Sequence, residues 1–277
     1  MFLHRFRNAL DYPLRQLFRW RRPGLRVRNE PKHALFARLP AEPRVAAQAT
    51  ADRLLAHYPL RYLHDHSRAL DYRENLYYLE LLERALTSVQ AALPAELAAA
   101  DIGPSHWFYV HALHALWTAW GGAQRTVTLT AYENDAFRVY ADLYSRWDHA
   151  QANMAGLPAE RVRYEPRAFA PQPGALDAVT MLFPFVFERD HLEWGLPGRL
   201  FQPAALLADA WASLKPGGVL IIINQGEAEH HAQRQMLEGL AIPVAAAFRH
   251  DSLLFRYDLP RYGLVALAPG LTAPAEA

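Results

Sequence analysis

The 277-residue chain contains no cysteine. Disulfides, cysteine-ligated zinc, iron–sulfur clusters and a cysteine nucleophile are therefore excluded, and the redox compartment is left open. The chain also lacks an apolar run close to the roughly 20 residues that span a bilayer. The net charge is only +1, which implies no global electrostatic partner. Apolar residues make up 52% of the chain, enough for a packed core and too many for overall disorder.

Positive charge is concentrated at the beginning of the chain. Residues 1–73 carry 15 Lys/Arg and 6 Asp/Glu, whereas residues 74–277 carry 14 and 22. The most basic part is residues 1–28, with eight arginines and one acid, Asp11. Such asymmetry predicts separate roles for the two segments.

Apolar side chains recur at helical spacing within the basic segment, at Leu3, Phe6, Leu10, Leu14 and Leu17. A basic amphipathic helix of this kind can lie on an anionic membrane, contact nucleic acid, or dock on its own domain with its arginines in solvent. It also resembles an organellar targeting peptide, but without the serine enrichment. We expect a cytoplasmic protein, with membrane-surface contact through residues 1–22 as one role of the helix.

Two segments are predicted from the proline pattern and the helical periodicity. Five prolines between residues 23 and 60 suggest a linker, interrupted by a short helix around residues 44–57. A stronger helix begins near Tyr72 and ends before Pro94. The prediction is therefore a basic helical extension and linker over residues 1–71 and a second domain over residues 72–277.

Strand and helix patterns alternate from about residue 97. Strands are predicted at 97–103, 125–133, 161–165, 176–183, 219–223, 243–249 and 262–268, and helices at 106–120, 135–154, 203–214 and 227–239. This alternation predicts an α/β fold, a doubly wound and mostly parallel seven-stranded sheet with helices on both faces. Ligands of such sheets bind beyond the carboxyl ends of the strands.

Two acids stand at the ends of predicted strands. Asp101 precedes Gly103 at the end of the first strand, and Glu133 ends the second. A carboxylate at the second position fits one that holds ribose hydroxyls, although Glu133 taken alone is more typical of a helix cap or a surface position. Because both strand ends face one crevice, the pair favours a nucleotide-like ligand.

Three stretches resemble the class I S-adenosylmethionine-dependent methyltransferases. LLADAWASLKPGGVLIII (residues 206–223) is similar to the helix, turn and fifth strand of that family. ADIG (100–103) stands at the first motif and LDAVTMLF (176–183) at the fourth strand. The resemblance extends over residues 97–268, and it implies a Rossmann-like fold with S-adenosylmethionine as cofactor.

The resemblance implies a role for each matching residue. The residues implied to bind the cofactor are Asp101, Gly103 and Ser105 near its methionine part, Glu133 on the ribose, Glu165 by the adenine and Phe183 near the transferred methyl group. The sequence departs from the family pattern of an acid followed by three alternate glycines, because Ser105 and Trp107 replace the second and third. This replacement puts cofactor binding in question.

Polar residues directly after the fifth strand are candidates for the acceptor side. Asn224 and Gln225 could orient an acceptor, and Glu227 could remove its proton. Alternatively, Asn224 or Gln225 only caps the next helix. The aromatic segment 183–195 either lines an apolar pocket or packs in the core. His111 and His114 have a spacing that metal ligands can use, but a helix this apolar favours ordinary partly buried histidines. The tracts His64-Asp65-His66 and His230-His231 lack a matching carboxylate, and no metal is expected.

Three functions are compatible with this pattern. The first is methyl transfer to an unidentified small molecule. The second is a catalytically inactive, methyltransferase-like binding or scaffold protein, which the altered glycine loop favours. The third is a nucleic-acid methyltransferase with the basic segment as its arm, which the net acidic remainder of the chain disfavours. The acceptor atom and the oligomeric state are left open.

Overall fold

The computed structural model describes residues 2–270, and they form one seven-stranded sheet with helices around it. The strands are β1 (Glu96–Ile102), β2 (Thr126–Tyr132), β3 (Val162–Glu165), β4 (Leu176–Leu182), β5 (Leu214–Gln225), β6 (Val244–His250) and β7 (Arg261–Leu267). The helices are α1 (Phe2–Phe18), α2 (Ala41–His57), α3 (Arg61–His66), α4 (Ala69–Val89), α5 (Val110–Ala119), α6 (Arg146–Asn153), α7 (Glu188–Glu193), α8 (Pro203–Ala212) and α9 (Gly226–Gly239). None of the helices over residues 2–270 is both long and apolar enough to cross a bilayer.

The strand order is β3-β2-β1-β4-β5-β7-β6, with β7 antiparallel to both of its neighbours and the other strands parallel. This is the doubly wound α/β topology of the class I methyltransferase fold, and it confirms the predicted fold class. The order reverses between β1 and β4, so their carboxyl ends frame the crevice where such sheets bind ligands.

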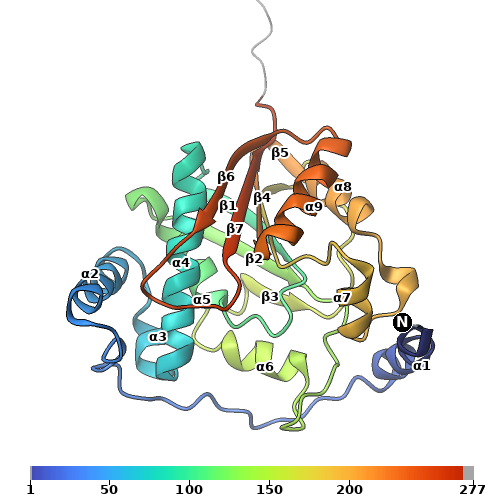
Figure 1. The fold of residues 1–277 in the computed structure, drawn as a ribbon, viewed down its shortest axis with the longest axis horizontal. Helices are drawn as coiled ribbons and strands as arrows, with labels where there is room; N and C mark the ends of the chain where they lie inside the picture. The colour runs from blue at the N-terminus through green and yellow to red at the C-terminus, as the bar shows by residue number, and fades with distance from the viewer. Residues whose placement is uncertain (1, 271–277) are drawn as a thin grey trace, which may run out of the picture.

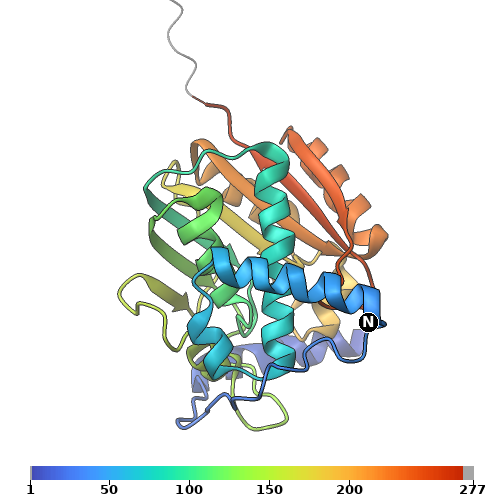
Figure 2. The same cartoon turned by 90° about the vertical axis from the view of Figure 1, so that its left-hand side faces the viewer.

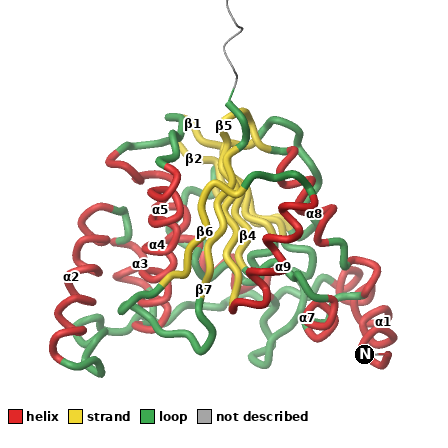
Figure 3. Tube along the Cα trace, turned by 45° about the horizontal axis from the view of Figure 1, so that its top comes forward, coloured by secondary structure: helices red, strands yellow, loops and turns green. Residues whose placement is uncertain are grey.

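Helices cover both faces of the sheet (Figures 1 and 3). On one face, α4 and α5 bury apolar side chains of the main core, and α2 crosses the outer side of α4 (Figure 2). On the other face, α8 and α9 cover a second core around β4 and β5. Both strands are buried along most of their length because helices lie above and below them, which explains their continuous apolar sequence.

Packing is continuous across the predicted boundary at residue 72. Part of the predicted extension lies in the main core, through Phe36, Ala47, Ala51, Leu54, Tyr58, Leu60 and Leu63. By contrast, α1 lies beside α7 and is attached mainly by polar contacts. Residues 2–34 therefore form the peripheral segment, whereas α2 and α3 share the core of the α/β domain.

Three predicted elements differ from those observed. The helix predicted over 106–120 begins only at Val110, because the left-handed Trp107 belongs to the loop before it. The helix predicted over 135–154 is wrong in its first half, because α6 begins only after Ser145. Ser145 and Asp148 form a capping box that starts the helix, and Val139 pairs with Ser145 in a short bridge before it. The turn predicted at Pro216–Gly218 lies within β5, where Gly217 has φ +77° and the register with β4 shifts.

Candidate functional site

The loop after β1 holds three alternate residues in the left-handed conformation. The angle φ is +73° at Gly103, +57° at Ser105 and +53° at Trp107. These are the three positions where the family pattern has glycine, the residue that adopts this conformation freely. For other residues it costs about 1–2 kcal/mol, so contacts around the loop must hold Ser105 and Trp107 in place.

Hydrogen bonds and burial supply these contacts. The Trp107 indole is fully buried in the main core, and its Nε1 donates to Asp101 Oδ2 at 2.7 Å. The Ser105 backbone N–H donates to Glu133 Oε2 at 2.8 Å, and the Tyr164 hydroxyl donates to the Ser105 carbonyl oxygen at 2.5 Å. The Trp107 ring therefore points into the main core and holds the loop against it.

Asp101 is the centre of this anchoring. Its carboxylate is fully buried and accepts hydrogen bonds from Trp107, from the Tyr109 hydroxyl at 2.8 Å and from the Thr180 hydroxyl at 2.7 Å. Burial raises the pKa of Asp101 to about 6, against the opposing effect of these hydrogen bonds. All of these partners belong to the chain itself, so Asp101 shapes the crevice through the loop that it holds.

Stability is expected to fall as the pH rises from about 4 to about 6. Unfolded aspartate has a pKa of about 3.9, so the folded state binds the extra proton within this window. A pKa of about 6 in the folded state corresponds to a contribution on the order of 3 kcal/mol. The test is the difference in free energy of unfolding between wild type and Asp101→Asn, measured in urea at several pH values. This difference should decrease by the same amount as the pH rises through the window. A pH-independent difference would contradict the assignment.

Glu133, at the end of β2, is buried and bonded on both oxygens. Oε2 accepts from the Ser105 N–H, and Oε1 accepts from the Asp135 N–H at 2.7 Å. Burial raises the pKa of Glu133, while the positive charge of Arg146 lowers it. The two acids that the sequence placed at adjacent strand ends are thus joined through one loop.

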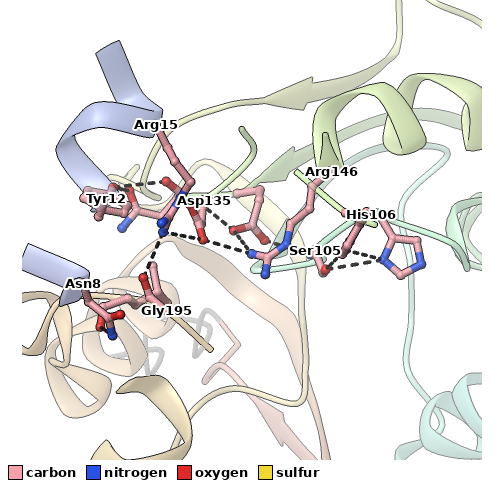
Figure 4. A network of polar contacts seen from close by, with 12 residues as sticks. Asn8, Tyr12, Arg15, Ser105, His106, Asp135, Arg146 and Gly195 are labelled. Atoms are coloured by element: carbon pink, nitrogen blue, oxygen red, sulfur yellow. Dashed lines mark hydrogen bonds and ion pairs between the residues drawn. The ribbon is translucent and has the colours of Figure 1, made fainter. Parts of the chain in front are cut away.

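Two arginines neutralise the acids after β2 (Figure 4). Arg146, at the first position of α6, is 1% exposed, and its Nη1 lies 3.7 Å from Glu133 Oε1 and 3.5 Å from Asp135 Oδ2. Arg15 of α1 binds the Asp135 carboxylate with Nε at 3.0 Å and Nη2 at 3.1 Å. Sequence reasoning missed Asp135, Arg146 and Arg15. The available signal was the second acid of AYEND, two residues after Glu133.

His106 belongs to the same loop. Its Nδ1 lies 3.2 Å from the Tyr140 hydroxyl, and its ring stacks on Phe108. Burial lowers the pKa of His106 to about 4, so the ring is neutral at pH 7. A neutral imidazole at the rim of the crevice can exchange hydrogen bonds without adding charge.

Glu165 and Phe183 lie at the ends of β3 and β4. Glu165 is partly exposed, and its carboxylate is 3.5 Å from Arg167 Nε. Phe183 has φ +58°, another left-handed residue at a strand end, and its ring lies 4.8 Å from the Arg261 guanidinium. Both residues lie at the carboxyl edge of the sheet, and their roles beside the adenine and the methyl group stay predictions.

The three polar residues predicted for the acceptor side, two at the end of β5 and one in α9, have different environments. Asn224 is fully buried, and within the described part of the chain neither of its amide atoms has a hydrogen-bond partner. The Gln225 N–H donates to the half-buried Glu229 carboxylate at 2.9 Å. Glu227 is exposed on the first turn of α9, where the helix dipole favours an acid in solvent. The role of Glu227 as general base therefore stays a prediction, for a side chain that is exposed in this structure.

An aromatic cluster around Arg261 lies beside Gln225, on the opposite face of the sheet from the Asn224 side chain. In the β5–β7 pairing, Gln225 is opposite Arg261. The guanidinium of Arg261 lies 3.9 Å from the Tyr257 ring, and the Tyr257 hydroxyl donates to Glu74 at 2.9 Å. Sequence reasoning missed this cluster, because its members come from α4, from the end of β4 and from the β6–β7 connection.

Comparisons with known proteins find similarity in structure only. No known family profile matches the sequence, and no curated protein matches it significantly. A solved S-adenosylmethionine-dependent methyltransferase of Aquifex aeolicus is 15% identical with a TM-score of 0.45, covering 79% of this chain and 97% of its own. One of Leishmania major is 10% identical with a TM-score of 0.48, covering 80% and 82%. The cyclase SpnF is 12% identical with a TM-score of 0.48, covering 69% and 81%. The fold assignment rests on the strand order itself.

Proposed function

We propose that the crevice at the carboxyl edge of the sheet binds S-adenosylmethionine and that the chain transfers its methyl group to a small-molecule acceptor. The observation that supports this most strongly is the left-handed loop of Gly103, Ser105 and Trp107 at the switch point. Strained backbone in residues other than glycine persists only where its surroundings over-determine it, and it gathers at ligand sites.

Two features of this edge support cofactor binding. A Cβ added to Gly103 would meet no atom within 4 Å, and Gly103 is exposed, so a ligand can approach the loop backbone closely. Each oxygen of Glu133 accepts one N–H. Since a carboxylate oxygen has two lone pairs, each retains an acceptor position for a ribose hydroxyl. Gly103 and Glu133 are the residues that would hold the cofactor, with Asp101 fixing the loop between them.

The chain's own contribution to the reaction would be orientation. S-adenosylmethionine, when bound, supplies a methyl group already activated by the sulfonium, so proximity and alignment carry most of the catalysis. Asn224 offers two donors and one acceptor without internal partners, and it would orient a polar group of the acceptor. Phe183, Tyr257 and Arg261 lie on the side of β5 that Gln225 shares, and they would contact an apolar or aromatic part of the acceptor there.

A second candidate is an inactive methyltransferase-like binding protein. It is favoured by the fact that Asp101 and Glu133 are both buried and bonded to the chain's own donors. In this alternative, Trp107 and Arg146 replace the ligand as partners of the acids. The two candidates differ in one measurable property, the affinity for the cofactor.

Calorimetric titration of the full chain with S-adenosylmethionine and its demethylated product tests the proposal. We expect wild type to bind both, and Glu133→Gln to bind about 10- to 150-fold more weakly, the effect of a lost hydrogen bond to a charged group. Glu160→Gln, an exposed acid before β3, is the matched control and should bind like wild type. Absence of binding by folded wild type at millimolar cofactor would favour the second candidate.

A further inference from the structure

Helix α1 faces its own domain with polar side chains. Asn8 Nδ2 donates to the carbonyl oxygens of Leu192 and Leu196 at 2.7 and 3.0 Å. The Tyr12 hydroxyl donates to Asn134 Oδ1 at 2.7 Å, and Arg15 pairs with Asp135 (Figure 4). These three residues recur every three or four positions, so they lie on one side of the helix.

The opposite side of α1 is apolar and exposed. We call it the α1 stripe, and its members are Leu3, Phe6, Leu10, Leu14, Leu17 and Phe18. Each is between 50% and 79% exposed. A surface helix of a globular domain normally turns its apolar side to the core. Because α1 does the reverse, its own domain does not account for the stripe.

The apolar surface continues beyond the helix. Trp20 is 51% exposed, and its Nε1 donates to the Leu143 carbonyl oxygen at 3.0 Å, which ties it to a loop with exposed Val139 and Leu143. A shallow hollow lies between α1 and this loop, and it is lined by Asp11, Leu14, Arg15, Phe18, Trp20, Phe137 and Val139. A contiguous apolar surface of this kind marks an interaction site.

We propose that the α1 stripe lies in the headgroup region of an anionic phospholipid bilayer. Arginine surrounds the stripe: residues 1–28 contain eight arginines and one acid. Of these, Arg7, Arg19, Arg21, Arg22, Arg26 and Arg28 are exposed. An apolar side with flanking arginines matches a helix that lies in the interface plane, with arginine bound to anionic headgroups.

The same charges disfavour the other occupants. Two copies meeting through the stripe would bring two arginine-rich segments together, and like charges oppose such contact. Nucleic acid would satisfy the arginines but would leave the apolar stripe in water. Of these three occupants, the anionic bilayer satisfies both the apolar and the cationic parts of this surface.

Co-sedimentation of the full chain with vesicles tests the proposal. We expect binding to vesicles of phosphatidylcholine with phosphatidylglycerol, little binding to phosphatidylcholine alone, and weakening at high salt. Leu10→Glu/Leu14→Glu should reduce the partition coefficient about 10-fold or more, because two anchoring side chains are lost. The variant should melt like wild type, since neither leucine is buried.

The matched control is Leu70→Glu/Leu253→Glu. Leu70 and Leu253 are 51% and 48% exposed, close to the 54% and 50% of Leu10 and Leu14. Unlike those two leucines, Leu70 and Leu253 lie outside α1. The control should bind vesicles like wild type. Equal loss in both variants, binding to an RNA oligonucleotide but not to vesicles, or self-association abolished by the α1 variant without vesicle binding would each overturn the proposal. None of these results depends on cofactor binding.

Discussion

Arg146→Ala is expected to destabilise the protein by about 3–5 kcal/mol, the loss that follows when one partner of a buried ion pair is removed. Arg146 is 1% exposed and faces both Glu133 and Asp135, which are themselves buried. Its guanidinium also lies 4.6 Å from the Trp194 ring, a contact that the variant loses. Chemical denaturation of wild type and variant at pH 7 measures the difference.

Arg167→Ala is the control for this experiment. Arg167 pairs with Glu165 at 3.5 Å, but its side chain is 55% exposed. Exposed pairs of this kind contribute about 0–1 kcal/mol. If Arg146→Ala cost no more than Arg167→Ala, the acids after β2 would not depend on Arg146 for their burial, and the network drawn around Glu133 would be wrong.

Trp107→Gly is expected to destabilise the protein by about 3–5 kcal/mol, although glycine is the residue of the family pattern. Relief of the left-handed conformation would return about 1–2 kcal/mol. Loss of a fully buried Trp side chain costs about 3–5 kcal/mol, and Asp101 would lose a donor worth about 1–3 kcal/mol. Urea denaturation should therefore show a large net loss.

Ser105→Gly separates strain from packing. Ser105 has the same left-handed conformation, but its hydroxyl makes only long contacts, 3.3 Å to the Tyr140 hydroxyl and 3.4 Å to His106 Nδ1. This variant should change the free energy of unfolding by no more than about 1 kcal/mol, in the stabilising direction. A stabilising Trp107→Gly would show that its ring contributes nothing to the loop.

The fold could be predicted because its signals are local. The run Val219–Ile223 is buried, as an apolar β-branched stretch between helices predicts. Every predicted strand exists, and all but β5 agree to within about two residues at their ends; β5 begins five residues before its predicted start. The start of α6 was also readable, because Ser145 and Asp148 have the spacing of a capping box. The helical periodicity around residues 135–144 was misleading, since those residues instead form the irregular segment that includes Asp135.

The candidate site could be predicted only in part. Sequence position placed Asp101, Gly103 and Glu133 at the carboxyl ends of neighbouring strands, and they are there. It could not distinguish the exposed Glu227 from the half-buried Glu229, because both lie in the first turn of α9 and differ in which side of the helix they occupy.

The sequence by itself determined the α/β class, the places of the strands and the amphipathic character of α1, because each depends on side chains close together in the chain. Only the tertiary structure decided which side of α1 faces the domain, that the Trp107 ring turns into the core, and that Arg146 and Arg15 neutralise the acids after β2. Periodicity shows that a helix has two sides but not what covers each. A buried charge is stable only beside its partner, and here those partners come from helices α1 and α6, which meet the segment after β2.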